Sequence, residues 1–282
     1  MTRPRPWVRP RCSLRPFIAP VYCVDNPPPP PAEWPPVTSG ELWDRASAER
    51  YDAEETEMSS ADVLGPTLDF LAELAGEGRA LEFAVGTGRV AVPLRERGVP
   101  VAGIEFSAHM AAVLRRKVDE ETLPVTLGDM ATTVVPGEFS LVYLVYNTIS
   151  NLLTQDEQVE CFRNAARHLA PGGRFVIELG VPPLRLLPPT QVAVPFDVSA
   201  HHIGFDTFDL VEQILVSHHL TRDGEDGRYR RSASRHRYAW PAELDLMARI
   251  AGLDLERRVA DWTGAPFTDD SAKHISVWRK PL

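Results

Sequence analysis

The chain has 282 residues, of which 44% are hydrophobic and 24% are charged, as is usual for a globular protein with a full hydrophobic core. Its formal net charge of −9 argues against a nucleic-acid substrate, because phosphate binding needs a basic face. No stretch approaches the ~20 apolar residues of a membrane span, and three widely spaced cysteines form neither a disulfide framework nor a zinc site, so we expect a cytoplasmic protein.

Proline and arginine dominate the first part of the chain. Residues 1–36 contain 12 of the 26 prolines, and residues 1–31 hold five arginines against one acid. Proline runs favour polyproline II or disorder, so residues 1–38 are predicted to be a disordered extension and residues 39–282 the folded domain. A docking tail for a proline-binding domain is the alternative interpretation of the same segment.

Helix and strand patterns alternate from residue 39 onward, which is typical of a parallel sheet with helices on both faces. Two helices come first, over 40–51 and 60–74. The strands expected next cover 80–85, 101–105, 125–127, 141–146 and 174–179, and the helices between them cover 89–97, 107–118 and 155–169.

The alternation stops after the fifth strand. Residues 190–238 are predicted to form a small antiparallel sheet, because hydrophobic and polar residues alternate over 213–217 and a turn signal follows at 223–227. A helix over 241–251 and two strands, about 254–262 and 273–280, complete the chain. We therefore expect an α/β fold with a mostly parallel seven-stranded sheet and a small antiparallel insert after strand five.

A glycine turn joins the first strand to its helix. Gly86 and Gly88 let the backbone turn sharply and leave it bare toward a ligand. The acid inside the strand, Glu82, is costly to bury unless something pairs with it, and a cationic ligand group would do so. Two further carboxylates, Glu105 and Asp129, follow the next two strands, at the edge where open α/β sheets bind ligands.

Four stretches follow one another along the chain: Glu82-Phe83-Ala84-Val85-Gly86-Thr87-Gly88-Arg89, Gly103-Ile104-Glu105-Phe106-Ser107, Leu127-Gly128-Asp129-Met130, and Leu169-Ala170-Pro171-Gly172-Gly173-Arg174-Phe175. In that order and spacing, over roughly residues 41–282, the chain resembles the class I S-adenosylmethionine-dependent methyltransferases of the small-molecule type. The resemblance implies a Rossmann-like fold, S-adenosylmethionine as cofactor and a small-molecule acceptor. In that family the residue matching Ala84 is usually glycine, so this chain adds one methyl group beside the cofactor.

The resemblance also implies roles for individual residues. Glu82 is expected to help orient the amino-acid end of the cofactor, and Glu105 to accept hydrogen bonds from both ribose hydroxyls. Asp129 is expected to accept from the adenine amino group, with Met130 packed on the ring. The complete set of expected cofactor contacts is Tyr51, Glu82, Ala84, Gly86, Gly88, Arg89, Glu105, Phe106, Asp129, Met130 and Tyr146.

Catalytic candidates follow the fourth strand and lie in the insert. Asn147 is expected to orient an acceptor, and Tyr146 to wall the pocket or pair with a cation. One member of the pair His218/His219 must face inward because side chains alternate along a strand, and His218 is our candidate general base. Polar wall or surface positions are the plainer interpretation of these histidines, and no spacing supports a metal site.

The predicted activity is transfer of a methyl group to a nitrogen or oxygen of a small molecule, by a monomer or homodimer, with residues 190–238 as a lid. Several alternatives stay open. Gly86, Gly88 and Ala91 followed by Glu105 also fit the fingerprint of a nicotinamide-dependent oxidoreductase. A catalytically inactive cofactor-binding scaffold, a peptide or protein acceptor, and a dimerisation role for the insert are the others.

Overall fold

The structure is a computed structural model that describes residues 43–54, 60–187, 191–223 and 227–282. The predicted extension over 1–38 lies outside the described residues. The described elements, in chain order, are α2 (Arg45–Glu54), α3 (Ala61–Ala75), β1 (Ala80–Phe83), α4 (Ala91–Glu96), β2 (Val101–Glu105), α5 (Ala108–Leu114), β3 (Val125–Leu127), β4 (Phe139–Leu144), η2 (Thr148–Asn151), α6 (Gln155–His168), β5 (Leu169–Gly180), η3 (Leu184–Leu186), β6 (Ala193–Val198), β7 (His202–Asp209), β8 (Ile214–Asp223), β9 (Arg228–Arg237), α7 (Pro241–Ile250), β10 (Asp254–Val259) and β11 (Lys273–Arg279).

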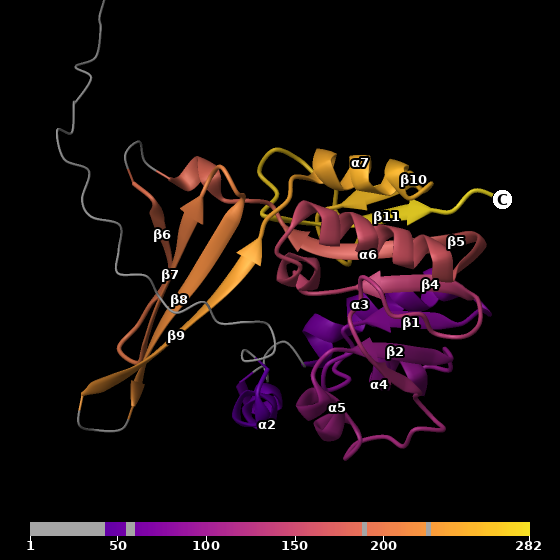
Figure 1. Ribbon diagram of the computed structural model, residues 1–282, viewed down its shortest axis with the longest axis horizontal. Coiled ribbons are helices and arrows are strands. Elements are labelled where there is room, and N and C mark those ends of the chain that lie inside the picture. Colours follow the sequence, from indigo (N-terminus) through magenta and orange to yellow (C-terminus); the bar gives the residue numbers. More distant parts are fainter. Residues whose placement is uncertain (1–42, 55–59, 188–190, 224–226) are drawn as a thin grey trace, which may run out of the picture. The chain divides into compact units, whose positions relative to one another are not determined.

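The central sheet has seven strands in the order β10-β11-β5-β4-β1-β2-β3 (Figure 1). Strand β11 runs antiparallel to both of its neighbours, and the pairs from β5 to β3 are parallel. Every residue of β1 and β2 is buried, as expected of parallel strands covered on both faces. The predicted seven-stranded, mostly parallel α/β fold is confirmed.

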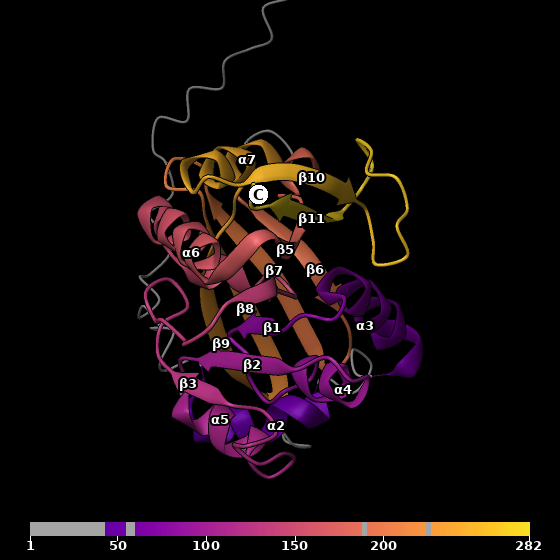
Figure 2. The same cartoon turned by 90° about the vertical axis from the view of Figure 1, so that its right-hand side faces the viewer.

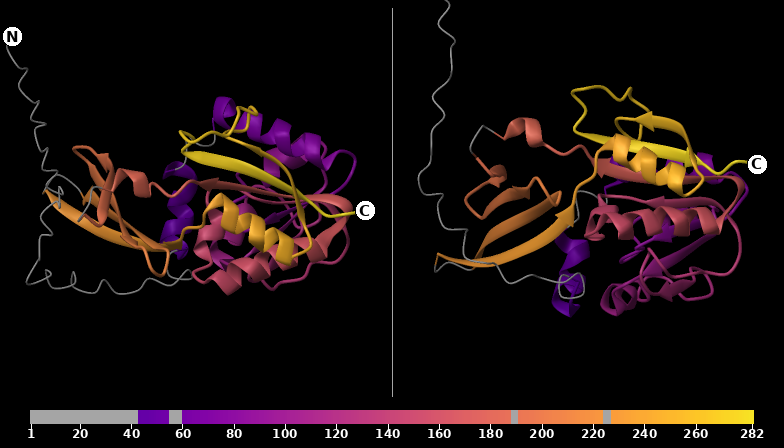
Figure 3. Two further views of the ribbon diagram at one scale, coloured as in Figure 1. Left: turned by 90° about the horizontal axis from the view of Figure 1, so that it is seen from above. Right: turned by 45° about the horizontal axis from the view of Figure 1, so that its top comes forward.

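Helices cover both faces of this sheet (Figures 2 and 3). On one face α6 and α7 pack on a core that contains Phe162, Phe175 and Trp278. On the other face α3 and α4 bury a second core that contains Leu71 and Leu94. Because the strands from β1 to β5 are parallel, their carboxyl ends meet at one edge, where open α/β sheets bind ligands.

Two strands end earlier than their hydrophobic pattern predicts. Strand β1 ends at Phe83, not at residue 85, and β4 ends at Leu144, not at residue 146. In both cases a residue with positive φ interrupts the strand, since Ala84 and Tyr146 each have φ 55°. Left-handed backbone at a non-glycine residue leaves no mark in the hydrophobic pattern, so the sequence overestimates both strands.

The predicted antiparallel insert is present as a separate four-stranded sheet in the order β6-β7-β8-β9. Its register pairs Gly204 of β7 with His219 of β8, and His219 with Ser232 of β9. Side chains alternate between its two faces, so residues of odd number on β8 share a face with residues of even number on β7 and β9. Among the helices described here, none is long and apolar enough to cross a membrane.

Candidate active site

Helix α2 is held against the glycine turn that follows β1. The Thr87 hydroxyl donates to Asp52 Oδ1 at 2.6 Å, and Lys117 Nζ lies 2.6 Å from Asp52 Oδ2. Lys117 Nζ also donates to the Thr87 carbonyl at 2.9 Å. These contacts join the turn to α2 and to the chain after α5, and α2 places Tyr51 beside the turn.

The two glycines of the turn have different structural roles. Gly88 has φ 83°, and a Cβ there would come within 2.8 Å of Val92 Cγ2 and 2.9 Å of Leu114 Cδ1. At Gly86, with φ 58°, a Cβ would make only ordinary contacts, with the end of Met110 at 3.6 Å and the Ala84 carbonyl oxygen at 4.0 Å. Gly88 therefore allows close helix packing, whereas Gly86 presents bare backbone to the space above the sheet.

Glu105 ends β2 and ties that strand to the same turn. Its Oε2 accepts from the Gly86 N–H at 2.7 Å, and its Oε1 accepts from the Ser107 N–H at 2.8 Å. The side chain is buried, and burial raises its pKa above the ordinary value, although both N–H donors oppose the shift. The carboxylate keeps further lone pairs, so it is able to accept additional hydrogen bonds from a ligand.

Glu82 is buried in β1 below the turn. The Tyr143 hydroxyl donates to Glu82 Oε2 at 3.0 Å. Burial raises the pKa of Glu82 to about 8, and the hydrogen bond from Tyr143 and the positive charge of Arg89 oppose that shift. A cationic group nearby favours the carboxylate over the neutral acid, so binding of a cationic ligand beside Glu82 would lower the pKa of this side chain.

Two consecutive residues after β4 adopt left-handed backbone, Tyr146 with φ 55° and Asn147 with φ 60°. Such conformations cost about 1–3 kcal/mol each and persist only where neighbours enforce them. Here Glu178 Oε2 accepts from the Tyr146 N–H at 3.0 Å, and Asn147 Oδ1 accepts from the Gly180 N–H at 2.7 Å. Lys273 Nζ holds the other Glu178 oxygen at 2.8 Å. Strand β5 therefore holds the turn in a strained conformation.

A cavity of about 950 Å³ lies between the carboxyl edge of the central sheet, α2 and one face of the small sheet. This volume is in the range of sites for cofactors and small ligands. Of the predicted site residues, those that line it are Tyr51, Glu82, Ala84, Gly86, Arg89, Tyr146 and Asn147. The small sheet contributes mainly polar side chains to the opposite wall, namely His202, Asp206, Ser217, His219, Thr221, Arg230, Ser232, Ser234 and His236.

Comparison with known proteins agrees with this geometry. The family model described as a methyltransferase domain matches residues 80–173. The solved structure of the CcbJ methyltransferase from Streptomyces caelestis is 34% identical, covers 85% of this chain and 100% of its own, and has a TM-score of 0.72. The chain belongs to the class I S-adenosylmethionine-dependent methyltransferases.

Two further relatives resemble this methyltransferase. The cypemycin N-terminal methyltransferase of a Streptomyces species is 25% identical over 241 residues, which are 84% of this chain and 96% of that protein. The structure of CalS10, an amino pentose methyltransferase from Micromonospora echinaspora, shares the fold with a TM-score of 0.64 at 19% identity, covering 82% of this chain and 96% of that one. The family places this enzyme among users of S-adenosylmethionine, which sets aside the nicotinamide alternative.

The residues at the glycine turn fit this cofactor. The bare backbone at Gly86 faces the cavity, the buried Glu105 carboxylate keeps acceptor capacity beside it, and Glu82 lies below. We expect Glu105 to hold the ribose hydroxyls and Glu82 to act on the cationic amino-acid end. Tyr51 and Arg89 flank the same part of the cavity.

Five of the predicted cofactor contacts do not line this cavity, namely Gly88, Glu105, Phe106, Asp129 and Met130. The Phe106 side chain is 56% exposed after β2, and Asp129 Oδ1 accepts from the Ala131 N–H at 2.7 Å. Met130 is buried in the core on the α6 side of the sheet. The adenine contacts of Asp129 and Met130 therefore stay predictions.

In the structure His219, and not the predicted His218, faces the cavity. His218 lies on the opposite face of β8, where its ring stacks on Phe205 with centroids 4.7 Å apart and its Nε2 lies 2.9 Å from Thr207 Oγ1. It does not line the cavity, whereas His219 does. Strand alternation places His218 and His219 on opposite faces of the small sheet. It does not say which of these faces lines the cavity, so the sequence alone could not choose between the two residues.

Ala84 carries backbone strain at the site, because it has φ 55°, at a position where the family usually has glycine. We expect Ala84→Gly to stabilise the enzyme by about 1 kcal/mol, since glycine adopts left-handed backbone without a Cβ penalty. Chemical denaturation of both proteins measures the change. Ala111→Gly, in the interior of α5, is the matched control and should destabilise by about 0.5–1 kcal/mol. Equal destabilisation of both variants would contradict the assignment of strain to Ala84.

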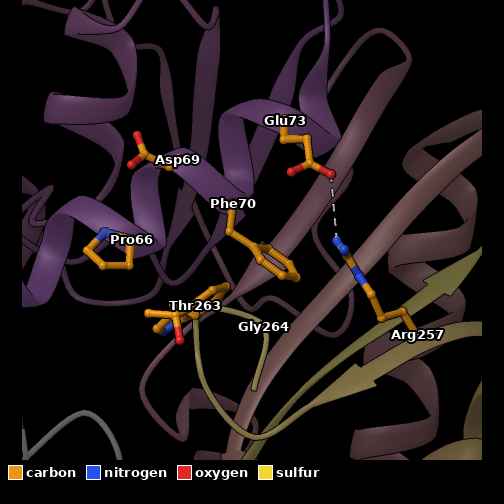
Figure 4. Close-up of a pocket in the computed structure, with 8 residues that line it drawn as sticks. Pro66, Asp69, Phe70, Glu73, Arg257, Thr263 and Gly264 are labelled. Atoms are coloured by element: carbon orange, nitrogen blue, oxygen red, sulfur yellow. Dashed lines mark ion pairs between the residues drawn. The ribbon is translucent and has the colours of Figure 1, made fainter. Parts of the chain in front are cut away.

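A second hollow, of about 410 Å³, lies between α3 and the loop after β10 (Figure 4). Its charged and aromatic groups contact one another. The Arg257 guanidinium lies 4.4 Å from the centre of the Phe70 ring and 4.0 Å from Glu73, and Phe70 meets Trp262 edge to face. It contains none of the predicted site residues, so the larger cavity is the candidate active site.

Proposed function

We propose that this methyltransferase methylates the nitrogen of a small, hydroxyl-rich amine held in the 950 Å³ cavity, with the small sheet β6–β9 forming the acceptor side. The observation that carries the proposal is the composition of the wall opposite the glycine turn. There Ser217, Ser232 and Ser234 stand among imidazoles and the Asp206 carboxylate, a mixture of donors and acceptors suited to hydroxyl groups.

The chain's own residues would position the acceptor. When bound, S-adenosylmethionine would supply a methyl group on a sulfonium, a carbon already activated for attack by the acceptor nitrogen. Asn147 Oδ1 is occupied by the Gly180 N–H, which orients its NH₂ group as a donor in the wall. Tyr146 offers an aromatic face, which already attracts the Arg89 cation at 5.6 Å.

The relatives support nitrogen as the accepting atom. The cypemycin enzyme is named for methylation of an N-terminus, and CalS10 for an amino pentose. A third protein, from Saccharopolyspora spinosa, is named as an amino-sugar N,N-dimethyltransferase and is 36% identical over 98 residues, 35% of this chain and 39% of that protein. An amine is common to these three acceptors.

Methyl transfer from labelled S-adenosylmethionine tests the proposal. We expect label in amino sugars and amino alcohols, and none in the matched sugars and polyols in which a hydroxyl replaces the amine. A peptide with a free N-terminus forms the third arm. Label confined to hydroxyl compounds would overturn nitrogen as the acceptor, and label confined to the peptide would overturn the small-molecule assignment.

A further inference from the structure

Three side chains form a hydrogen-bonded line across the small sheet, from its edge strand to the cavity. Asp197 Oδ2 on β6 lies 2.5 Å from His202 Nδ1 on β7. His202 Nε2 lies 3.0 Å from His219 Nδ1 on β8. His202 and His219 both line the cavity, and the Asp197 side chain is 44% exposed.

This line sets the positions of the protons when the His202 imidazole is neutral. An ionised carboxylate only accepts, so His202 Nδ1 carries the hydrogen that it donates to Asp197. The lone pair of a neutral His202 is then on Nε2, and His219 donates to it from Nδ1. The remaining nitrogen of His219, Nε2, is left with a lone pair. Within the described part of the chain no hydrogen bond to this atom is seen.

We propose that His219 is the general base for the acceptor amine, and that His202 and Asp197 are positioning residues that orient it. The inference rests on the proposed N-methylation. An amine is mostly an ammonium ion at neutral pH and lacks the lone pair that a nucleophile needs. One N–H bond of the ammonium breaks, a hydrogen forms a bond to His219 Nε2, and the electron pair stays on the acceptor nitrogen. The positive charge on the imidazole is then stabilised through His202 by Asp197.

The surroundings of His219 keep it neutral before the reaction. Burial lowers the pKa of His219 below the ordinary value of a histidine, and a positive charge on His202 or His218 would lower that pKa further. The titratable and charged groups on the same face are Asp206 on β7, Arg230 and His236 on β9, and His202; Asp197 lies beyond His202 on β6. Because a base must be unprotonated to act, turnover should stay constant above the lowered pKa and fall only below it.

Nitrogen-15 NMR of the labelled full-length protein tests the proton positions without any acceptor. At pH 7 we expect His219 to be neutral, with its proton on Nδ1. In Asp197→Asn the amide is able either to accept from His202 through its oxygen or to donate to it through its NH₂ group, so the constraint on the tautomers is lost. A fraction of His219 with its proton on Nε2 should then appear. A charged His219, or a proton on Nε2 in the unmodified protein, would overturn the proposal.

Methyl transfer to the amine that the unmodified enzyme labels fastest is the second arm. General base catalysis contributes about 10²–10⁴-fold to a rate, so His219→Gln should lower kcat at least ~100-fold at pH 7. Turnover by this variant should also no longer decrease at acid pH, because the titrating base is absent. The matched control His201→Gln changes an exposed histidine in the turn before β7 and should leave both unchanged. Affinity for S-adenosylhomocysteine, measured by calorimetry, should be equal in all three proteins.

The two proposals fail in different ways. If the unmodified enzyme labels no amine, the proposed function fails. If it labels amines but His219→Gln keeps its kcat and its pH profile, the assignment of His219 fails while N-methylation stands. Recovery of kcat in His219→Gln with added imidazole would support a proton-transfer role over a structural one.

Discussion

Replacing Glu105 by alanine is expected to weaken S-adenosylmethionine binding at least tenfold. Hydrogen bonds to a charged group contribute about 1.5–3 kcal/mol each, and we expect this carboxylate to make two to the ribose. The structure adds a second effect, because Glu105 also accepts from the Gly86 and Ser107 N–H groups and so shapes the glycine turn. Isothermal titration calorimetry measures the change in Kd.

Two further variants serve as controls. Glu105→Gln loses the charge and keeps only one acceptor oxygen, so one of the Gly86 and Ser107 N–H groups loses its partner, and its loss of affinity combines the ribose contact with part of the turn geometry. Glu77→Ala removes an exposed acid in the loop before β1 and should leave Kd unchanged. Unchanged affinity in Glu105→Ala, or tight binding of a nicotinamide dinucleotide by the unmodified enzyme, would contradict the assignment.

Arg237→Met is expected to lower the free energy of unfolding by about 3–5 kcal/mol. Arg237 ends β9 and is buried, with Nη2 at 2.7 Å from Glu243 of α7 and Nη1 donating to Gln158 of α6 at 2.6 Å. It also donates to Gln213 at 3.0 Å, in the turn before β8. Removing Arg237 leaves the Glu243 carboxylate, whose side chain is 14% exposed, without its counter-charge. The free-energy cost of such an unpaired charge exceeds the net stabilisation that the intact ion pair provides. Urea denaturation followed by circular dichroism measures the loss.

The same substitution should also affect the acceptor wall. Arg237 and Gln158 connect the small sheet to the helices on the central sheet, and Gln158 Nε2 donates back to the Arg237 carbonyl at 3.2 Å. We expect KM for the amine to rise in Arg237→Met at temperatures where the protein stays folded. Arg235→Met, two residues earlier on an exposed position of β9, should change neither stability nor KM. Equal stability of the two variants would show that Arg237 does not hold the small sheet to the helices on the central sheet.

Several site residues were beyond prediction from the sequence. Glu178 holds the strained Tyr146 turn, and its only sequence signal is an acid inside a buried strand, the same signal that identified Glu82. Gln158 and Arg237 stand 79 residues apart, so no local pattern connects them. The small sheet was expected from its alternation, but alternation does not say which of its faces meets the cavity.

The sequence by itself determined the fold, because the fold depends on local features: apolar strands, helix stops, the glycine turn and acids placed directly after strands. The kind of cofactor came from the resemblance to a known family that four ordered motifs carry. The tertiary structure alone decided which side chains meet across the cavity. Whether His218 or His219 faces the acceptor depends on which face of the small sheet packs toward the central one. The line from Asp197 to His219 needs three strands in register, and its distances depend on strand pairing that no single segment encodes.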